Sequence, residues 1–377
     1  MKKLSAPMNT HSSEKENIIR LLLSGQEENI TVALQIAKSL NIDLTTFTAE
    51  IEALAKWVKC SSFSFPKKLV KIVKQEECRF GMPIPSAQLG YLTNLKKLSL
   101  EGNQLEAIPA EIWQLNQLTQ LKVSKNKLSS LPPDMGNLTQ LTRLYISYNQ
   151  LSELPPEIGN LNNLEELNVG VNQLTALPAA IGKLEKLMEL YVGTNLLTRL
   201  PPEIGKLTQL QKMGLGHNKL AELPKEMGNL TQLRQLGLES NKLTSLPEEI
   251  WNLTQLQYLG LTGNKLTSLP PEIGNLKKLF SLEVDRNQLI TLPVEFWELA
   301  NLKVLNLGKN KLTCLSPAIA RLSRLYSLDL QRNKLTTIPE EIKQIPYLQY
   351  LDLKDNPIPD SEQERIKALL PDCKIRF

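Results

Sequence analysis

The sequence predicts an α/β solenoid in which a parallel β-sheet lines the concave face and short helical or 3₁₀ turns line the convex face. Three features of a repeated 23-residue unit support this prediction. The first is an asparagine that returns at this interval without insertion or deletion, and a fixed period in this range is typical of repeat arrays. These landmark asparagines form a predicted structural ladder: Asn103, Asn126, Asn149, Asn172, Asn195, Asn218, Asn241, Asn264, Asn287, Asn310, Asn333 and Asn356.

The second feature is the pattern L-x-x-L-x-L before each asparagine, as in Leu256, Leu259 and Leu261. Alternation of apolar and polar residues predicts a short strand whose leucines point inward and whose x residues point to the opposite face. The asparagine side chain both donates and accepts hydrogen bonds. It can therefore satisfy backbone groups of the bend that follows, which have no regular ladder partner.

The third feature is the other half of the unit, L-P-x-E-I, as in Leu269 to Ile273. Proline at a helix start and glutamate in the first turn favour a helical beginning. Glycine follows in several repeats, as at Gly274, and weakens a helix. We therefore expect a single helical or 3₁₀ turn on the convex face of each repeat.

A repeat of this kind cannot bury its own leucines, so the array needs stacking and a cap at each end. Residues 1–12 are expected to be disordered, and three amphipathic runs predict a helical N-terminal capping region over 13–80. Twelve repeats should occupy 81–358, and a helix followed by a strand should form a C-terminal cap over 359–377. With both caps, we expect the chain to be complete and not a fragment.

Composition restricts the partners and the compartment. The 44 basic and 39 acidic residues give a net charge of +5, a mixed surface that indicates no nucleic acid. No run of 18 apolar residues exists and no apolar segment follows Met1, so neither a membrane span nor a secretory signal is expected. The cysteines at 60, 78, 314 and 373 lie far apart and favour a reducing compartment. We expect a cytoplasmic monomer.

Catalytic chemistry is not indicated. The two histidines, His11 and His217, cannot form a nucleophile–base group with that spacing, and neither zinc-ligand spacing nor a phosphate-binding loop is present. The glutamates of the P-x-E positions follow the repeat period instead of breaking it at one place. We therefore expect no enzyme activity, and no catalytic, cofactor-binding or metal-binding residues.

The x residues of the strands are free of the folding constraint and should report on a partner. Tyrosine, arginine and methionine, which are enriched at interface centres, gather in the third to fifth repeats. The alternative is that tyrosine simply suits exposed strands. Glycines at 214, 237 and 260 are expected to leave a shallow trough beside this cluster. The predicted protein-binding residues on the concave face are Arg143, Tyr145, Tyr148, Val171, Met188, Tyr191, His217 and Tyr258.

Tryptophan replaces the usual glycine of the convex turn at Trp113, Trp251 and Trp297. These side chains either form a second contact surface or pack over neighbouring turns, and the sequence leaves both interpretations open.

The string L-x-x-L-x-L-x-x-N-x-L-x-x-L-P-x-E-I, over roughly 84–358, resembles the leucine-rich-repeat superfamily. Its 23-residue form is similar to bacterial cytoplasmic repeat proteins and to the Ras-group intracellular scaffolds. The resemblance implies a right-handed, horseshoe-shaped solenoid that mediates protein–protein contacts, commonly in signalling. Larger relatives carry GTPase, kinase or ubiquitin-ligase domains, for which this chain has no room outside the caps, and Cys373 matches no ligase nucleophile motif.

The leading hypothesis is a non-catalytic scaffold that binds a protein partner on its concave face. The first alternative is a translocated or surface-exposed bacterial effector that binds a host protein. The second is an enzyme of unrecognised type.

Overall fold

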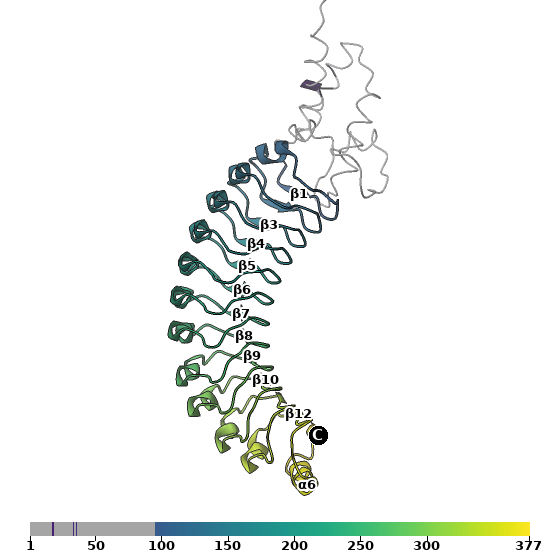
Figure 1. Ribbon diagram of the computed structural model, residues 1–377, viewed down its shortest axis with the longest axis vertical. Helices are drawn as coiled ribbons and strands as arrows, with labels where there is room; N and C mark the ends of the chain where they lie inside the picture. The colour runs from purple at the N-terminus through teal and green to yellow at the C-terminus, as the bar shows by residue number, and fades with distance from the viewer. Residues whose placement is uncertain (1–16, 19–32, 34, 36–94) are drawn as a thin grey trace, which may run out of the picture. The chain divides into compact units, whose positions relative to one another are not determined.

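The computed structural model describes residues 17, 18, 33, 35 and 95–377 (Figure 1). The predicted disordered tail and the predicted helical capping region lie almost wholly outside these residues, so both stay predictions. Asn17, Ile18, Ala33 and Gln35 are helical.

The strands form one parallel sheet in which their order follows the chain from β1 to β13, as the sequence predicts for a solenoid. Adjacent repeats pair in register, so that Leu259 lies opposite Leu282 and Leu282 lies opposite Leu305. The strands are β1 (Lys97–Ser99), β2 (Gln120–Lys122), β3 (Arg143–Tyr145), β4 (Glu166–Asn168), β5 (Glu189–Tyr191), β6 (Lys212–Gly214), β7 (Gln235–Gly237), β8 (Tyr258–Gly260), β9 (Ser281–Glu283), β10 (Val304–Asn306), β11 (Ser327–Asp329), β12 (Tyr350–Asp352) and β13 (Lys374–Arg376).

A five-residue 3₁₀ turn follows each of the first eleven strands, in agreement with the prediction of a single short turn per repeat. In most of these turns a proline precedes or opens the turn and an acidic residue lies in its first positions. The turns are η1 (Ala110–Gln114), η2 (Pro133–Asn137), η3 (Pro156–Asn160), η4 (Ala179–Lys183), η5 (Pro202–Lys206), η6 (Lys225–Asn229), η7 (Glu248–Asn252), η8 (Pro271–Asn275), η9 (Val294–Glu298), η10 (Pro317–Arg321) and η11 (Glu340–Gln344).

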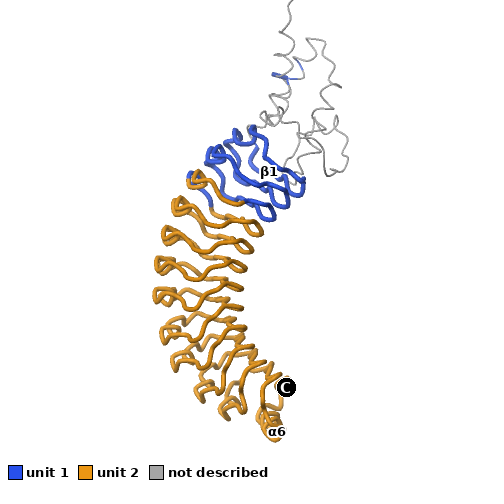
Figure 2. The backbone as a smooth tube through the Cα atoms, viewed as in Figure 1, with its two compact units in different colours: residues 1–151, 160–164 blue, residues 152–159, 165–377 orange. Residues whose placement is uncertain are grey.

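The chain divides into two compact units (Figure 2). Unit 1 comprises residues 1–151 and 160–164, and unit 2 comprises residues 152–159 and 165–377. Within unit 2 the strands β4 to β13 lie on one side of the stack and the 3₁₀ turns lie on the other (Figure 1). The side chains between these two layers form the core.

Leucine supplies most of that core, and the strand leucines are fully buried throughout. Trp113, Trp251 and Trp297 are also buried, with exposed fractions of 3%, 1% and 1%. The ring of Trp297 meets Phe296 edge to face, with the ring centroids 5.3 Å apart. The contact-surface interpretation of the three tryptophans is therefore wrong, because their side chains are buried.

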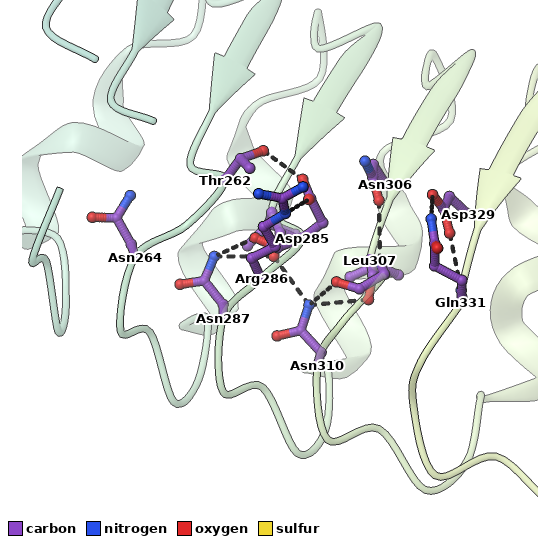
Figure 3. A network of polar contacts seen from close by, with 12 residues as sticks. Thr262, Asn264, Asp285, Arg286, Asn287, Asn306, Leu307, Asn310, Asp329 and Gln331 are labelled. Carbon is purple, nitrogen blue, oxygen red and sulfur yellow. Dashed lines mark hydrogen bonds and ion pairs between the residues drawn. The ribbon is translucent and has the colours of Figure 1, made fainter. Parts of the chain in front are cut away.

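The landmark asparagines connect each repeat to the one before it. In Asn218, the amide Nδ2 donates to the carbonyl of Leu215 in its own repeat at 2.9 Å and to that of Val192 in the preceding repeat at 3.1 Å. Its Oδ1 accepts from the backbone N–H of Leu197 at 3.0 Å. Asn287 and Asn310 repeat the Nδ2 pattern, and part of their network is visible in Figure 3.

The last repeat of unit 2 is followed by α6 (Asp360–Leu369) and then by β13, which pairs with β12. Ile366 of α6 is fully buried. Arg365 bonds Glu362 through Nε at 2.8 Å and donates from Nη2 to the carbonyl of Ile338 at 2.6 Å. The helix is thereby fixed to the preceding repeat by a buried apolar contact and by a guanidinium group.

Asn218→Ala should lower the free energy of unfolding by roughly 1–3 kcal/mol, because it leaves buried backbone groups without partners. Urea denaturation measures this loss. Asn229→Ala makes the same change at an exposed position of η6 and should alter stability by less than about 0.5 kcal/mol. Equal effects at the two positions would show that the ladder does not stabilise the stack.

Glu362→Gln should destabilise the chain at neutral pH and lose this effect in acid. The Arg365 guanidinium lowers the pKa of Glu362 to about 2 from an ordinary value of 4.5. The stability that the ionised carboxylate contributes is therefore fully present above pH 4.5 and is lost as the pH falls towards 2. Thermal midpoints measured across this range should converge for the two proteins.

Glu364→Gln is the matched control, because among the described residues this exposed glutamate of α6 pairs only with Lys367, three residues on. An exposed ion pair contributes little to the free energy of unfolding. If the thermal midpoint of Glu364→Gln changed with pH as that of Glu362→Gln does, the pH-dependent stability could not be attributed to the contact between Glu362 and Arg365.

Candidate protein-binding face

The first and third residues of each strand point away from the leucine core, because successive side chains alternate between the two faces of a strand. In β9, for example, Leu282 is fully buried while Glu283 is half-buried on the opposite side. We call this side of β4 to β13 in unit 2 the strand face. Its side chains are not needed to fill the core, so they are available to a partner.

Three of the predicted binding residues belong to unit 1. Arg143 and Tyr145 are the first and third residues of β3. The Lys122 ammonium lies 5.2 Å from the centre of the Tyr145 ring. Tyr148 has an exposed fraction of 56%.

The other five, Val171, Met188, Tyr191, His217 and Tyr258, belong to unit 2. Tyr191 donates from its hydroxyl to Glu189 Oε2 at 2.7 Å, and Glu189 Oε1 lies 2.9 Å from the Lys212 ammonium. Tyr191 is in β5 and Tyr258 is in β8, so the structure places them in separate groups and not in one cluster.

Tyr148, Val171 and His217 share a backbone feature that the sequence analysis did not include. Each directly precedes a landmark asparagine and has a positive φ, of 56°, 54° and 57°. The left-handed region is unfavourable for a β-branched residue such as Val171. Its backbone N–H is held by the carbonyl of Gly193 at 2.9 Å, so the stack imposes this conformation.

The expected glycine trough is filled by side chains. A Cβ built on Gly214 would lie 3.2 Å from Cδ1 of Tyr191. A Cβ built on Gly260 would collide with Oε1 of Glu239 and would lie 2.7 Å from the hydroxyl of Tyr258. The glycines therefore make room for these side chains to lie flat on the sheet, and the trough prediction is wrong for that reason.

Carboxylates gather around Tyr258. Its hydroxyl donates to Glu239 Oε1 at 2.9 Å, and burial raises the pKa of Tyr258, with Glu239 adding to the shift. Burial also raises the pKa of Glu283, and the charges of Glu239 and Asp285 raise it further. Among the described residues, neither Glu239 nor Glu283 forms an ion pair with a cation.

Asp285 is the better-compensated member of this group. It accepts a hydrogen bond from the Thr262 hydroxyl, and its Oδ2 lies 3.6 Å from Nε of Arg286 (Figure 3).

The acidic and amide residues that end β10, β11 and β12 have a structural role. Asn306 and Asp329 each accept the backbone N–H of the residue two positions on, at 3.1 Å and 2.9 Å (Figure 3). Asp352 accepts from Lys354 in the same way at 3.0 Å. Short side chains at this position cap the end of the strand. The longer Glu283 is not seen to make this bond.

The structure also shows a group of exposed apolar side chains that the sequence analysis missed. Tyr326 and Tyr350 meet edge to face, with ring centroids 5.4 Å apart. The apolar residue directly precedes the strand in β9 and β11 and is the first residue of the strand in β10 and β12. A comparison of these two positions along successive repeats would have revealed the group. We call this group the apolar row: Phe280 (exposed fraction 41%), Val304 (38%), Tyr326 (45%) and Tyr350 (46%).

In the part of the chain that the structure describes, no group of three or more His, Cys, Asp or Glu side chains is placed to hold a metal ion. Over the same residues, no helix has the length and apolarity needed to cross a membrane. Burial raises the pKa of the Cys373 thiol to about 11, which leaves little thiolate at neutral pH and makes it a poor nucleophile.

Glu283→Gln should stabilise the folded chain at neutral pH. Because the pKa of Glu283 is raised above its ordinary value of 4.5, the ionised side chain destabilises the fold above its folded pKa. The cost disappears as the pH falls below 4.5, where the carboxyl is protonated in both states. The thermal midpoint of the variant should exceed that of the wild type at pH 7 and match it at low pH. Glu272→Gln, at an exposed glutamate of η8, should show no such convergence.

Comparisons with known proteins support the repeat assignment. A family model described as a leucine-rich repeat region matches residues 43–152, 146–246 and 243–325, and a second, described as a leucine-rich repeat, matches 301–358. A comparison with curated proteins gives no match.

Several solved structures are similar. A leucine-rich-repeat protein of Leptospira interrogans is 32% identical, with a TM-score of 0.62, and the match covers 87% of this chain and 98% of that one. An internalin of Listeria monocytogenes is 25% identical, with a TM-score of 0.61, over 77% of this chain and 88% of its own.

A third similar structure is the plant peptide hormone receptor RGFR1 in complex with RGF2. It is 30% identical, with a TM-score of 0.64, and the match covers 73% of this chain and 50% of the receptor. The fold, the family models and these structures agree, and the chain belongs to the leucine-rich-repeat family.

Proposed function

We propose that this chain is a non-catalytic scaffold that binds a protein partner on the side of the sheet that faces away from the leucine core. One observation carries the proposal. The leucines and most landmark asparagines are buried, whereas large apolar side chains between them, such as Tyr148 and Tyr326, are exposed. Exposed aromatic side chains on a rigid framework are typical of protein-binding surfaces.

The comparisons support a protein ligand. Leucine-rich-repeat folds are typical protein-interaction modules, and the similar receptor RGFR1 is found in complex with RGF2. The predicted residues Arg143 and Tyr145 in unit 1 and Tyr191 and Tyr258 in unit 2 are the side chains that we assign to binding first, since all four lie on strands.

A cytoplasmic, monomeric state is part of the same proposal. The free thiols of Cys314 and Cys373 support the cytoplasmic part of the proposal. The effector alternative requires export without a standard signal. Fractionation of a culture that expresses the protein distinguishes the two, because only the effector would accumulate in the supernatant.

Affinity capture from native lysate, followed by mass spectrometry, tests the proposal. The full chain should retain a protein that the double variant Arg143→Glu/Tyr145→Ala loses, because the first change reverses a charge and the second removes a ring from β3. Circular dichroism should show that the variant is still folded.

The matched control is Arg199→Glu/Tyr347→Ala, which makes the same chemical changes at exposed positions outside the strands. This variant should capture the protein as the wild type does. Equal capture by all three proteins would move the site away from β3.

A further inference from the structure

The apolar row crosses four consecutive strands of unit 2, from β9 to β12. The backbone N–H of Val304 donates to the carbonyl of Phe280 at 3.1 Å, and that of Tyr350 donates to the carbonyl of Tyr326 at 3.2 Å. Val304 pairs with Ser327, the residue directly after Tyr326. The backbones at these four positions are therefore neighbours from one repeat to the next, and the rings of Tyr326 and Tyr350 are in contact.

None of these four side chains fills the leucine core, since each is exposed by more than a third. Aliphatic residues or small polar residues would serve the fold equally well at these positions. A strip of two tyrosines, a phenylalanine and a valine on a sheet indicates a surface that a partner covers.

An acceptor-rich column runs beside the row. The third residues of the same four strands are Glu283, Asn306, Asp329 and Asp352, and none of them carries positive charge. Val304 and Asn306 are two residues apart in β10, as are Tyr350 and Asp352 in β12, so each pair shares a face and lies roughly 7 Å apart. Glu283 pairs with Asn306 and Asp329 pairs with Asp352 on the neighbouring strands, so both carboxylates are within reach of a segment that lies on the row.

Two of these carboxylates have no cation in the part of the chain that the structure describes. Glu283 is surrounded by Glu239, Asp285 and the Tyr258 hydroxyl, and Asp329 is bonded to Gln331. Asp352, in contrast, lies 3.2 Å from the Arg376 guanidinium. Negative charge that the fold leaves uncompensated is complementary to a basic ligand.

We infer that the apolar row and the adjacent carboxylates dock an extended segment of a partner protein that carries both apolar and basic side chains. This inference rests on the proposed function and specifies the partner's chemistry. Strands lie about 4.8 Å apart, so the distance from β9 to β12 is about 14 Å, which corresponds to about four residues of an extended segment. Apolar side chains of the segment cover the row, while its lysine or arginine side chains donate to Glu283 and Asp329.

Other kinds of segment fit less well. An uncharged apolar segment would remove water from Glu283 and Asp329 without supplying a donor, which is costly. An acidic segment would be repelled by the same carboxylates. The exposed Lys303, next to Val304, is the cation among the residues at and just before the starts of β9 to β12. Arg286 and Arg332, beyond the ends of β9 and β11, already lie beside Asp285 and Asp355.

Selection from a display library of random 12-residue peptides tests this inference. The library is selected on the immobilised full chain and, in parallel, on Tyr326→Ser/Tyr350→Ser. Peptides enriched on the wild type alone should combine apolar residues with a net positive charge. A synthetic copy of the most enriched peptide should bind the tyrosine variant and Glu283→Lys/Asp329→Lys at least tenfold more weakly by fluorescence anisotropy, and should bind the wild type more weakly as salt rises.

The control is Tyr347→Ser/Glu272→Lys, which makes matching changes at exposed positions outside the strands and should leave peptide affinity unchanged. Three results would overturn the inference: an acidic or uncharged consensus, equal enrichment on the tyrosine variant, or no enrichment. If the lysate experiment still yields a protein that depends on Arg143 and Tyr145, the proposed function stands and only the docking of a basic segment on the row is rejected.

Discussion

Most of the landmark asparagines bond backbone groups that the strand ladder does not reach, and they do so across two repeats. The amide of Asn241, for example, reaches Leu238 in its own repeat and Leu215 in the preceding one, while its oxygen accepts from Leu220. One side chain thus fixes both the bend after the strand and the distance to the neighbouring turn. A repeat with one residue more or fewer would move these groups out of reach, which explains why the interval stays at 23 residues throughout the array.

Because every repeat has the same length, residues at one position of successive repeats line up across the strands and form a column on the surface. Within one column, the chemistry of a side chain determines whether it serves the fold or remains available. Asn306 and Asp329 are short enough to accept a backbone N–H two residues on, so one oxygen of each is used by the strand end, while the charge of Asp329 has no cation beside it among the described residues. Glu283 occupies the same column with one more methylene group, and its carboxylate lies among other acids instead. Asp329 and Glu283 carry the same charge in the same column but therefore differ in what they do.

The regular part of the fold was predictable because it depends on the spacing of residues along the chain. The strands, the 3₁₀ turns and the burial of the leucines all follow from local periodicity. The covered glycines, the buried tryptophans and the apolar row depend on what the adjacent repeat presents, about 4.8 Å away across the sheet. Gly260 is informative only together with Glu239 and Tyr258, and Tyr326 only together with Tyr350. Such pairs can be found in a sequence only by comparing equivalent positions of neighbouring repeats.

The separation of framework from surface also determines how recognition can change in this protein. The leucine core and the asparagine bonds are set by positions outside the row, so substitutions of the row should alter binding at little cost to stability. Asp329 differs, because it also accepts a backbone N–H at the end of β11. Glu283 differs from the row because its ionised carboxylate destabilises the free chain. Burial and its acidic neighbours make the charged form unfavourable. A basic partner would remove that cost on binding. Part of the affinity would then come from relieving an electrostatic penalty that the folded chain already carries, and this part would favour basic ligands over neutral ones of the same shape.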